Sequence, residues 1–227
     1  MRSKDSEKEI AHTQIPLNEV DRRYEEASRG EARKLEPRPQ QLEMSHRVLK
    51  AFNTHARIAV EAPTGTGKSI AYLLPGVLWA REAGTPLVVS THSKALQDQL
   101  LEKDMPKIRQ ITGISDLKAA TVKGQDNYLC LRKLSDWVES ITLESSLEER
   151  WCAAFLVAYQ AMCGAAELDR ISHYLRNRFE QLGTWIERVR SHHTTTLGPT
   201  CGFYKTCHFF NSARLAHQAD VVIANHA

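Results

Sequence analysis

Residues 62–69 constrain the fold of this chain more than any other stretch, because they combine two glycines, a lysine and a hydroxyl at a fixed spacing. The stretch reads Ala-Pro-Thr-Gly-Thr-Gly-Lys-Ser. The apolar run 58–60 before it predicts a strand, and the Leu- and Ala-rich run 70–79 after it predicts a helix. A strand, a glycine-containing turn and a helix start are the context of a phosphate-binding loop. A chance glycine turn is the alternative interpretation.

Several residue types in this loop suit the chemistry of phosphate. Gly65 and Gly67 let the backbone curl so that its N–H groups surround phosphate oxygens, and the helix N-terminus adds partial positive charge. Lys68 supplies a cation for the β- and γ-phosphates, and the Ser69 hydroxyl can ligate Mg²⁺. We expect Lys68 and Ser69 to be catalytic. The predicted binding residues are Ala62, Pro63, Thr64, Gly65, Thr66, Gly67, Lys68 and Ser69.

A short element upstream of the loop indicates that the nucleotide carries adenine. Residues 37–41 read Pro-Arg-Pro-Gln-Gln, and the residues after them place apolar side chains at helical spacing. The amide of Gln41 both donates and accepts hydrogen bonds, which matches the N6/N7 edge of adenine. We therefore predict ATP with Mg²⁺ as the cofactors, and we add Arg38 and Gln41 to the binding residues.

A strand and a helix that follow the loop offer groups to a nucleic acid. Residues 87–91 read Leu-Val-Val-Ser-Thr, which predicts a buried parallel strand, and Ser93 can cap a helix over 94–101. Hydroxyls and helix N-terminal donors suit backbone phosphates. We predict Thr91, Ser93 and Gln97 as nucleic-acid contacts. The alternative is an ordinary strand–helix unit with polar caps.

The remaining pattern predicts an α/β fold with a parallel sheet and an inserted helical domain. Residues 117–122 and 219–227 predict further strands, and a long helical pattern over 135–190 separates them, with its aromatic residues most simply forming a core. Residues 17–34 predict a polar helix that is either a frayed tail or a small accessory element. The expected domains are an accessory segment 1–36, a first part 37–124, an insertion 125–207 and a return 208–227.

Composition narrows the partners and the compartment. The chain has 227 residues, five cysteines and a formal net charge of +3, which permits a nucleic-acid partner without requiring one. No apolar run reaches the roughly 18 residues that span a bilayer, and the N-terminus lacks a signal-peptide core. We expect no membrane partner and a cytoplasmic location, where the cysteines are thiols or metal ligands rather than disulfides.

The order of these motifs resembles the DinG branch of the XPD-like helicases, in the second helicase superfamily. The matching stretches are 37–41, 61–69, 88–99, 123–130 and 201–227. Helicases of that superfamily commonly tolerate alanine at the first loop position, which is Ala62 here. The resemblance implies a RecA-like first lobe and ATP-driven 5′→3′ translocation on single-stranded DNA. Single-stranded and duplex DNA are then the implied partners.

The same resemblance implies an iron–sulfur domain within the insertion. Cys130, Cys201 and Cys207 match three of the family's four ligand places for a [4Fe–4S] cluster, and the fourth place holds Thr196. A threonine hydroxyl is a poor substitute for a thiolate. We therefore expect a vestigial domain that has lost its cluster, as in the CRISPR-associated DinG helicases of type IV systems, with a CRISPR ribonucleoprotein as partner. A substitute ligand from Cys152, Cys163, His192 or His193 is the alternative.

Other functions remain open at this point. Members of the family carry an Asp-Glu-x-His box and a second RecA-like lobe beyond the stretch that ends here at Ala227. We expect the N-terminal part of a longer helicase, which alone would bind nucleotide weakly and hydrolyse almost no ATP. The alternatives are a chromosomal DinG-like repair helicase with an intact cluster, a nucleic-acid-binding module that never hydrolyses ATP, and a P-loop kinase.

Overall fold

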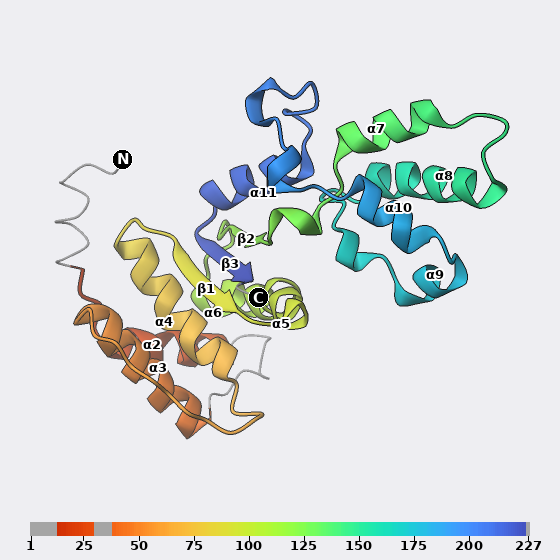
Figure 1. The fold of residues 1–227 in the computed structure, drawn as a ribbon. Helices are drawn as coiled ribbons and strands as arrows, with labels where there is room; N and C mark the ends of the chain where they lie inside the picture. The colour runs from red at the N-terminus through yellow and green to blue at the C-terminus, as the bar shows by residue number, and fades with distance from the viewer. Residues whose placement is uncertain (1–12, 30–37, 226–227) are drawn as a thin grey trace. The chain divides into compact units, whose positions relative to one another are not determined.

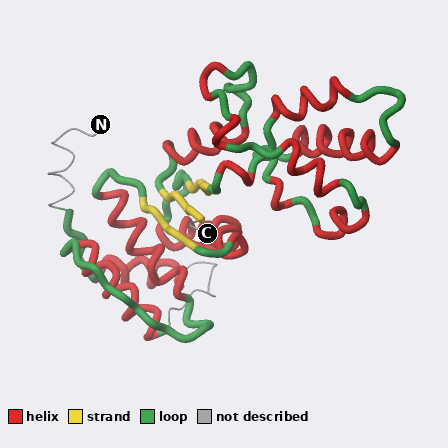
Figure 2. Tube along the Cα trace, viewed as in Figure 1, coloured by secondary structure: helices red, strands yellow, loops and turns green. Residues whose placement is uncertain are grey.

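The computed structural model describes residues 13–29 and 38–225, which form a mixed α/β structure that is mostly helical (Figures 1 and 2). The chain divides into two compact units. The first unit comprises residues 1–121 and 218–227, and the second comprises residues 122–217. The second unit contains the whole of the predicted insertion 125–207 and extends beyond it at both ends. Among the described residues, no helix is long and apolar enough to cross a membrane.

The first unit is built around a three-stranded sheet in which the last strand lies in the middle. The strand order is β1-β3-β2, and β1 and β3 run parallel, with Leu87 opposite Val221 and Thr91 opposite Asn225. Its elements are α2 (Asn18–Arg29), α3 (Pro39–Asn53), α4 (Lys68–Glu82), β1 (Leu87–Thr91), α5 (Lys94–Gln99), a π-helical turn (Leu100–Asp104), α6 (Met105–Thr112), β2 (Ala119–Val122) and β3 (Val221–Asn225).

Helix α4 supplies the centre of this unit's core. Leu73, Leu74 and Val77 are buried, and they join Leu49 of α3 and Ile223 of β3 in one apolar cluster. Gly76 within α4 allows β1 to pack closely against the helix, because a Cβ at this position would lie 2.9 Å from a methyl group of Leu87. The start of α4, where the loop 62–69 ends, is therefore fixed by the core behind it.

Helix α2 is a packed helix rather than a frayed tail over residues 18–29. Val20, Tyr24 and Ala27 follow helical spacing, and all three are buried in the core of the first unit. Arg23 also donates a 2.8 Å hydrogen bond to the carbonyl of Thr112 at the end of α6. The other residues of the predicted accessory segment, 1–12 and 30–36, and the end of the chain at 226–227, lie outside the described residues.

The strand predicted at residues 58–60 is wrong. These residues adopt no regular structure, and the side chains of Ile58 and Val60 are 48% and 38% exposed. A strand requires a hydrogen-bonded neighbour, and none of the three described strands pairs with this segment. A short apolar run alone is therefore not sufficient to predict a strand.

The second unit is helical and has its own core. Trp137 stacks on Trp185 with ring centroids 4.5 Å apart, and Trp137 belongs to an apolar cluster with Leu156 and Ile186. The aromatic residues are not all core, however, because Trp151 is 60% exposed. The α-helices are α7 (Leu131–Ser140), α8 (Leu147–Met162), α9 (His173–Arg178), α10 (Leu182–Val189) and α11 (His208–His217).

A buried ion cluster lies at the beginning of the second unit. The ammonium of Lys123 donates to Glu167 at 2.7 Å and to Asp169 at 3.2 Å, and the side chains of Lys123 and Glu167 are 1% and 6% exposed. Arg170 donates to the same carboxylate at 2.7 Å. Burial alone would lower the pKa of Lys123, but the hydrogen bonds and negative charges of its two partners raise it. The cluster holds the chain after β2 against the loop that follows α8.

Candidate nucleotide-binding site

The loop 62–69 adopts a turn that depends on its glycines. Gly65 and Gly67 have φ angles of +82° and +77°, a region that other residues rarely occupy. Gly67 caps α4, and its carbonyl accepts the first helical hydrogen bond from Ala71 at 3.1 Å. By helical geometry the N–H groups of the first residues of α4 have no acceptor within the helix. The loop therefore ends on donors suited to an anion.

The ammonium of Lys68 reaches back to the first residues of the loop 62–69. It donates to the carbonyls of Ala62 at 2.7 Å and Pro63 at 2.9 Å. The hydroxyl of Thr66 donates to the same Pro63 carbonyl at 2.9 Å. Charge-assisted bonds to phosphate are stronger than bonds to neutral carbonyls. Lys68 can therefore exchange these carbonyls for a polyphosphate.

Two side chains from the start of α3 hold the glycines of the loop. Arg38 donates to the carbonyl of Gly65, and Gln41 donates to the carbonyl of Gly67 at 3.1 Å. Pro39 at the first turn of α3 fixes the entry of this helix. The residues that the sequence linked to adenine thus also fix the phosphate loop, a contact that spacing alone did not reveal. Adenine recognition itself stays a prediction.

Ser69 lies in the first turn of α4, one helical turn before Tyr72. Burial raises the pKa of Tyr72, and the nearby hydroxyl of Ser69 opposes that shift. Tyr72 is thus a neighbour of Ser69 that sequence reasoning missed. The assignment of Ser69 to Mg²⁺ remains a prediction.

The three predicted nucleic-acid residues occupy different environments. Ser93 caps α5, because its hydroxyl accepts from the N–H of Leu96 at 3.1 Å. Thr91 is only 5% exposed at the end of β1. Gln97 is fully buried, and it donates to the carbonyl of Ile223 at 2.7 Å. The amide of Gln97 thus joins α5 to β3, and its contact with nucleic acid stays a prediction.

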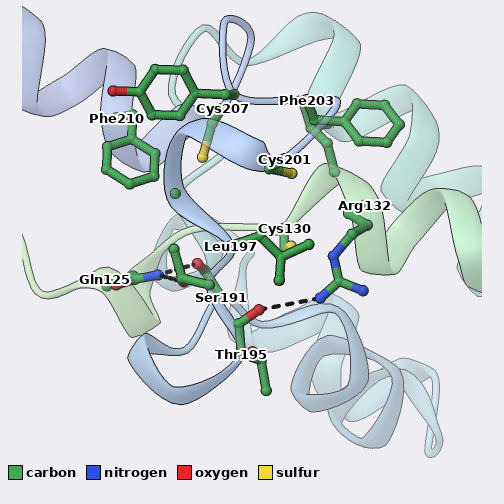
Figure 3. Close-up of a pocket in the computed structure, with 14 residues that line it drawn as sticks. Gln125, Cys130, Arg132, Ser191, Thr195, Leu197, Cys201, Phe203, Cys207 and Phe210 are labelled. Atoms are coloured by element: carbon green, nitrogen blue, oxygen red, sulfur yellow. Dashed lines mark hydrogen bonds between the residues drawn. The ribbon is translucent and has the colours of Figure 1, made fainter.

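The three predicted cysteine ligands line one pocket of the second unit (Figure 3). Cys130 precedes α7, Cys201 follows a short turn, and Cys207 precedes α11. Thr196 lines the same pocket. The sequence positions that the resemblance grouped are thus brought together by the fold.

The side chains of this pocket do not fit a [4Fe–4S] cluster. The hydroxyl of Thr196 donates to the carbonyl of His192 at 2.8 Å and accepts from Gln125, which also donates to Ser191 at 3.0 Å. None of the proposed substitute ligands, Cys152, Cys163, His192 and His193, lines the pocket. Within the described ranges, no group of three or more His, Cys, Asp or Glu side chains is arranged to hold a metal ion. A hydrogen-bond network therefore occupies the place where the fourth ligand of a cluster would lie.

Comparison of the sequence with known proteins identifies the family of this chain. The DEAD/DEAH box helicase family matches residues 38–151. The ATP-dependent DNA helicase YoaA of Haemophilus influenzae is 32% identical over 197 residues, and the ATP-dependent DNA helicase DinG of Escherichia coli K12 is 33% identical over 206 residues. Each match covers 84% of this chain and 28% of the relative. The chain thus spans less than a third of the length of these distant homologues. Because the family match covers half of its residues, the chain belongs to the DEAD/DEAH box helicase family.

Proposed function

We propose that this chain is the nucleotide-binding part of an ATP-dependent DNA helicase of DinG type, with a RecA-like lobe that works in the cytoplasm. The loop 62–69 carries the proposal, because its two left-handed glycines close onto the start of α4 and Arg38 and Gln41 fix them there. The parallel pairing of β1 with β3 supports the RecA-like lobe. The relatives whose names are ATP-dependent DNA helicases support the activity.

Three predicted residues then have distinct roles in nucleotide binding and hydrolysis. Lys68 leaves the carbonyls of Ala62 and Pro63 and binds the β- and γ-phosphates, while the free N–H groups of the first turn of α4 bind phosphate oxygens. The hydroxyl of Ser69 would hold Mg²⁺, which would neutralise phosphate charge when bound. Gln41 reads adenine and transmits its presence to Gly67.

DNA is the proposed substrate of the whole protein, as single strands for 5′→3′ translocation and as duplexes for unwinding. Thr91 lies at the end of β1, and Ser93 caps the start of α5. A backbone phosphate at this place can meet helix N-terminal donors. Such contacts release counterions, so single-strand binding should weaken as the salt concentration rises.

DNA-stimulated ATP hydrolysis by the longer protein that contains this chain tests the proposal. Lys68→Ala should lower the DNA-stimulated rate by about a hundredfold or more, since it removes a cation that stabilises the transferred phosphoryl group. Lys50→Ala on the exposed side of α3 is the matched control. Unchanged turnover in Lys68→Ala would refute the helicase assignment. ADP release that requires a phosphate acceptor would indicate a kinase instead.

A second proposal concerns the iron–sulfur domain. The hydrogen-bond network at Thr196 favours a cluster-free helicase of the CRISPR-associated kind, with a CRISPR ribonucleoprotein as partner, over a chromosomal repair helicase. Iron quantification on anaerobically purified protein separates the two. About four irons per chain would rule out the vestigial domain and favour the chromosomal alternative. The position of the gene beside CRISPR genes tests the partner.

A further inference from the structure

The pocket lined by the three cysteines has little free space. Its cavity measures about 30 Å³, which is about the share of liquid volume that one water molecule takes. A [4Fe–4S] cluster would place four iron and four sulfur atoms between its protein ligands. Aromatic rings line the pocket beside the cysteines, and they belong to Phe203, Tyr204 and Phe210 (Figure 3). The pocket is therefore closed by side chains of the chain itself.

Gln125, which also lines this pocket, binds both ends of the loop 191–196. Its amide N–H groups donate to the hydroxyl of Ser191 at 3.0 Å and to the hydroxyl of Thr196. Thr196 donates in turn to the carbonyl of His192 at 2.8 Å. An amide nitrogen carries two N–H donors, so both are used here. One side chain thus joins the loop to a position that lies 66 to 71 residues earlier in the sequence.

Two further hydrogen bonds join the same loop to the neighbours of Gln125. Arg132 donates to the carbonyl of Thr195 at 3.3 Å (Figure 3), and the N–H of Ser191 donates to the carbonyl of Tyr128 at 2.9 Å. Tyr128 and Ser191 are buried, and hydrogen bonds shielded from water are electrostatically stronger. Several protein hydrogen bonds therefore hold this loop against the beginning of the second unit.

On the basis of the cluster-free helicase proposed above, we propose that Gln125 takes the structural place of the iron–sulfur cluster. A cluster with ligands at Cys130 and at position 196 would join the same two stretches of chain that Gln125 joins through Ser191 and Thr196. The three cysteines are half-buried thiols. The fold of the second unit then depends on the amide of Gln125, and the cysteines are dispensable for it.

Cluster binding at position 196 would break these contacts. Gln125 would move away from Thr196, and the hydroxyl of the buried Ser191 would lose an amide donor. Removal of the partner of a buried polar group is costly, and the hydroxyl of Thr196 would be a poor iron ligand in return. The residues present therefore favour the hydrogen bonds over a cluster.

Amide hydrogen exchange of the whole chain, measured by mass spectrometry over residues 191–201, tests which groups hold the loop. Gln125→Ala should speed exchange in these residues by about tenfold, because two hydrogen bonds are lost. A variant in which all three cysteines of the pocket are replaced by serine should exchange there within about twofold of the wild-type rate. A loop held by a cluster would show the reverse order.

Gln181→Ala is the matched control, because it removes an exposed amide at the start of α10 that makes no cap hydrogen bond. It should leave exchange over residues 191–201 unchanged. Thr196→Val removes a single hydroxyl at nearly constant volume, and it should speed exchange by about fivefold. Circular dichroism verifies that each variant folds, and Thr196→Val decides the test if Gln125→Ala does not fold.

Faster exchange in the serine variant, or unchanged exchange in both Gln125→Ala and Thr196→Val, would overturn the role of Gln125. Iron quantification on the same anaerobically purified protein separates this failure from failure of the proposed function. About four irons per chain would overturn the cluster-free helicase and the role of Gln125 together. Unchanged exchange in iron-free protein would overturn the role of Gln125 and leave the cluster-free helicase standing.

Discussion

Gly67 combines a left-handed backbone with close packing, so it is the residue of the loop that tolerates substitution least. Its φ is +77°, and a Cβ there would lie 2.5 Å from the side-chain nitrogen of Gln41. Gly67→Ala should therefore displace Gln41 and lower ATP affinity by about tenfold, in addition to about 1 kcal/mol of backbone strain. Isothermal titration with Mg·ATP measures the affinity, and urea unfolding measures the strain.

Gly84 supplies the control for this prediction. Its φ is +61°, and nothing lies within 4 Å of a Cβ built there. Gly84→Ala should show the strain of about 1 kcal/mol without any loss of ATP affinity. Equal losses of affinity in the two variants would show that the Gln41 contact has no role in nucleotide binding.

His208 gives the second unit a stability that depends on pH. The side chain is 7% exposed, and burial lowers its pKa below the ordinary value of 6.5, while an approach to the backbone of Gly164 weakly opposes the shift. The unfolded chain binds a proton below pH 6.5 and the folded chain resists it. The free energy of unfolding should therefore fall as the pH drops below 6.5, by up to about 1.4 kcal/mol at pH 5.5.

Urea unfolding at pH 7.5 and pH 5.5 measures this effect by comparison with His208→Phe. The variant lacks the ionisable ring, so its stability should fall less over this interval than that of the wild type. Parallel pH profiles for the two proteins would show that His208 has the same pKa in the folded and unfolded states and would contradict this prediction.

At the scale of elements, the ion cluster after β2 has the largest predicted effect on stability. Lys123→Met would leave Glu167 and Asp169 without their ammonium partner, in surroundings where the Glu167 side chain is 6% exposed. Removal of one member of a buried ion pair costs about 3–5 kcal/mol. Thermal unfolding followed by circular dichroism measures this loss. Lys103→Met, on an exposed side chain of the π-helical turn, should change stability by about 0.5 kcal/mol or less.

The elements that the sequence predicted well are those with local signals. The helix after Lys68 and the parallel strand 87–91 were confirmed, because glycine caps and β-branched runs act over a few residues. The strand is not buried along its length as predicted, since Val88 is 62% exposed. Helix α2 was undervalued, since only three of its residues are buried and its charged face dominates its composition. The prediction of a strand at 58–60 was wrong, because strand pairing depends on a neighbouring strand elsewhere in the chain. Trp151 failed as a core residue because periodicity cannot tell which face of α8 is covered.

At the scale of the whole molecule, the mixed α/β class was predictable, but the contacts between distant residues were not. Gln97 faces Ile223 across 126 residues of sequence, and Gln125 meets Thr196 across 71 residues. No local pattern indicates such pairs. The loop 62–69 was predictable because its chemistry is contained in eight consecutive residues. The roles of Arg38 and Gln41 in holding that loop required the packing of α3 against α4.

The affinity of this chain for Mg·ATP, measured by isothermal titration in the wild type, Lys68→Ala and Lys50→Ala, tests the nucleotide site most directly. The wild type and Lys50→Ala should bind ATP equally, and Lys68→Ala should bind at least about tenfold more weakly, because it loses the charge-assisted contact with the phosphates. Equal affinities in all three proteins, or no ATP binding by the wild type, would contradict a phosphate-binding loop at residues 62–69.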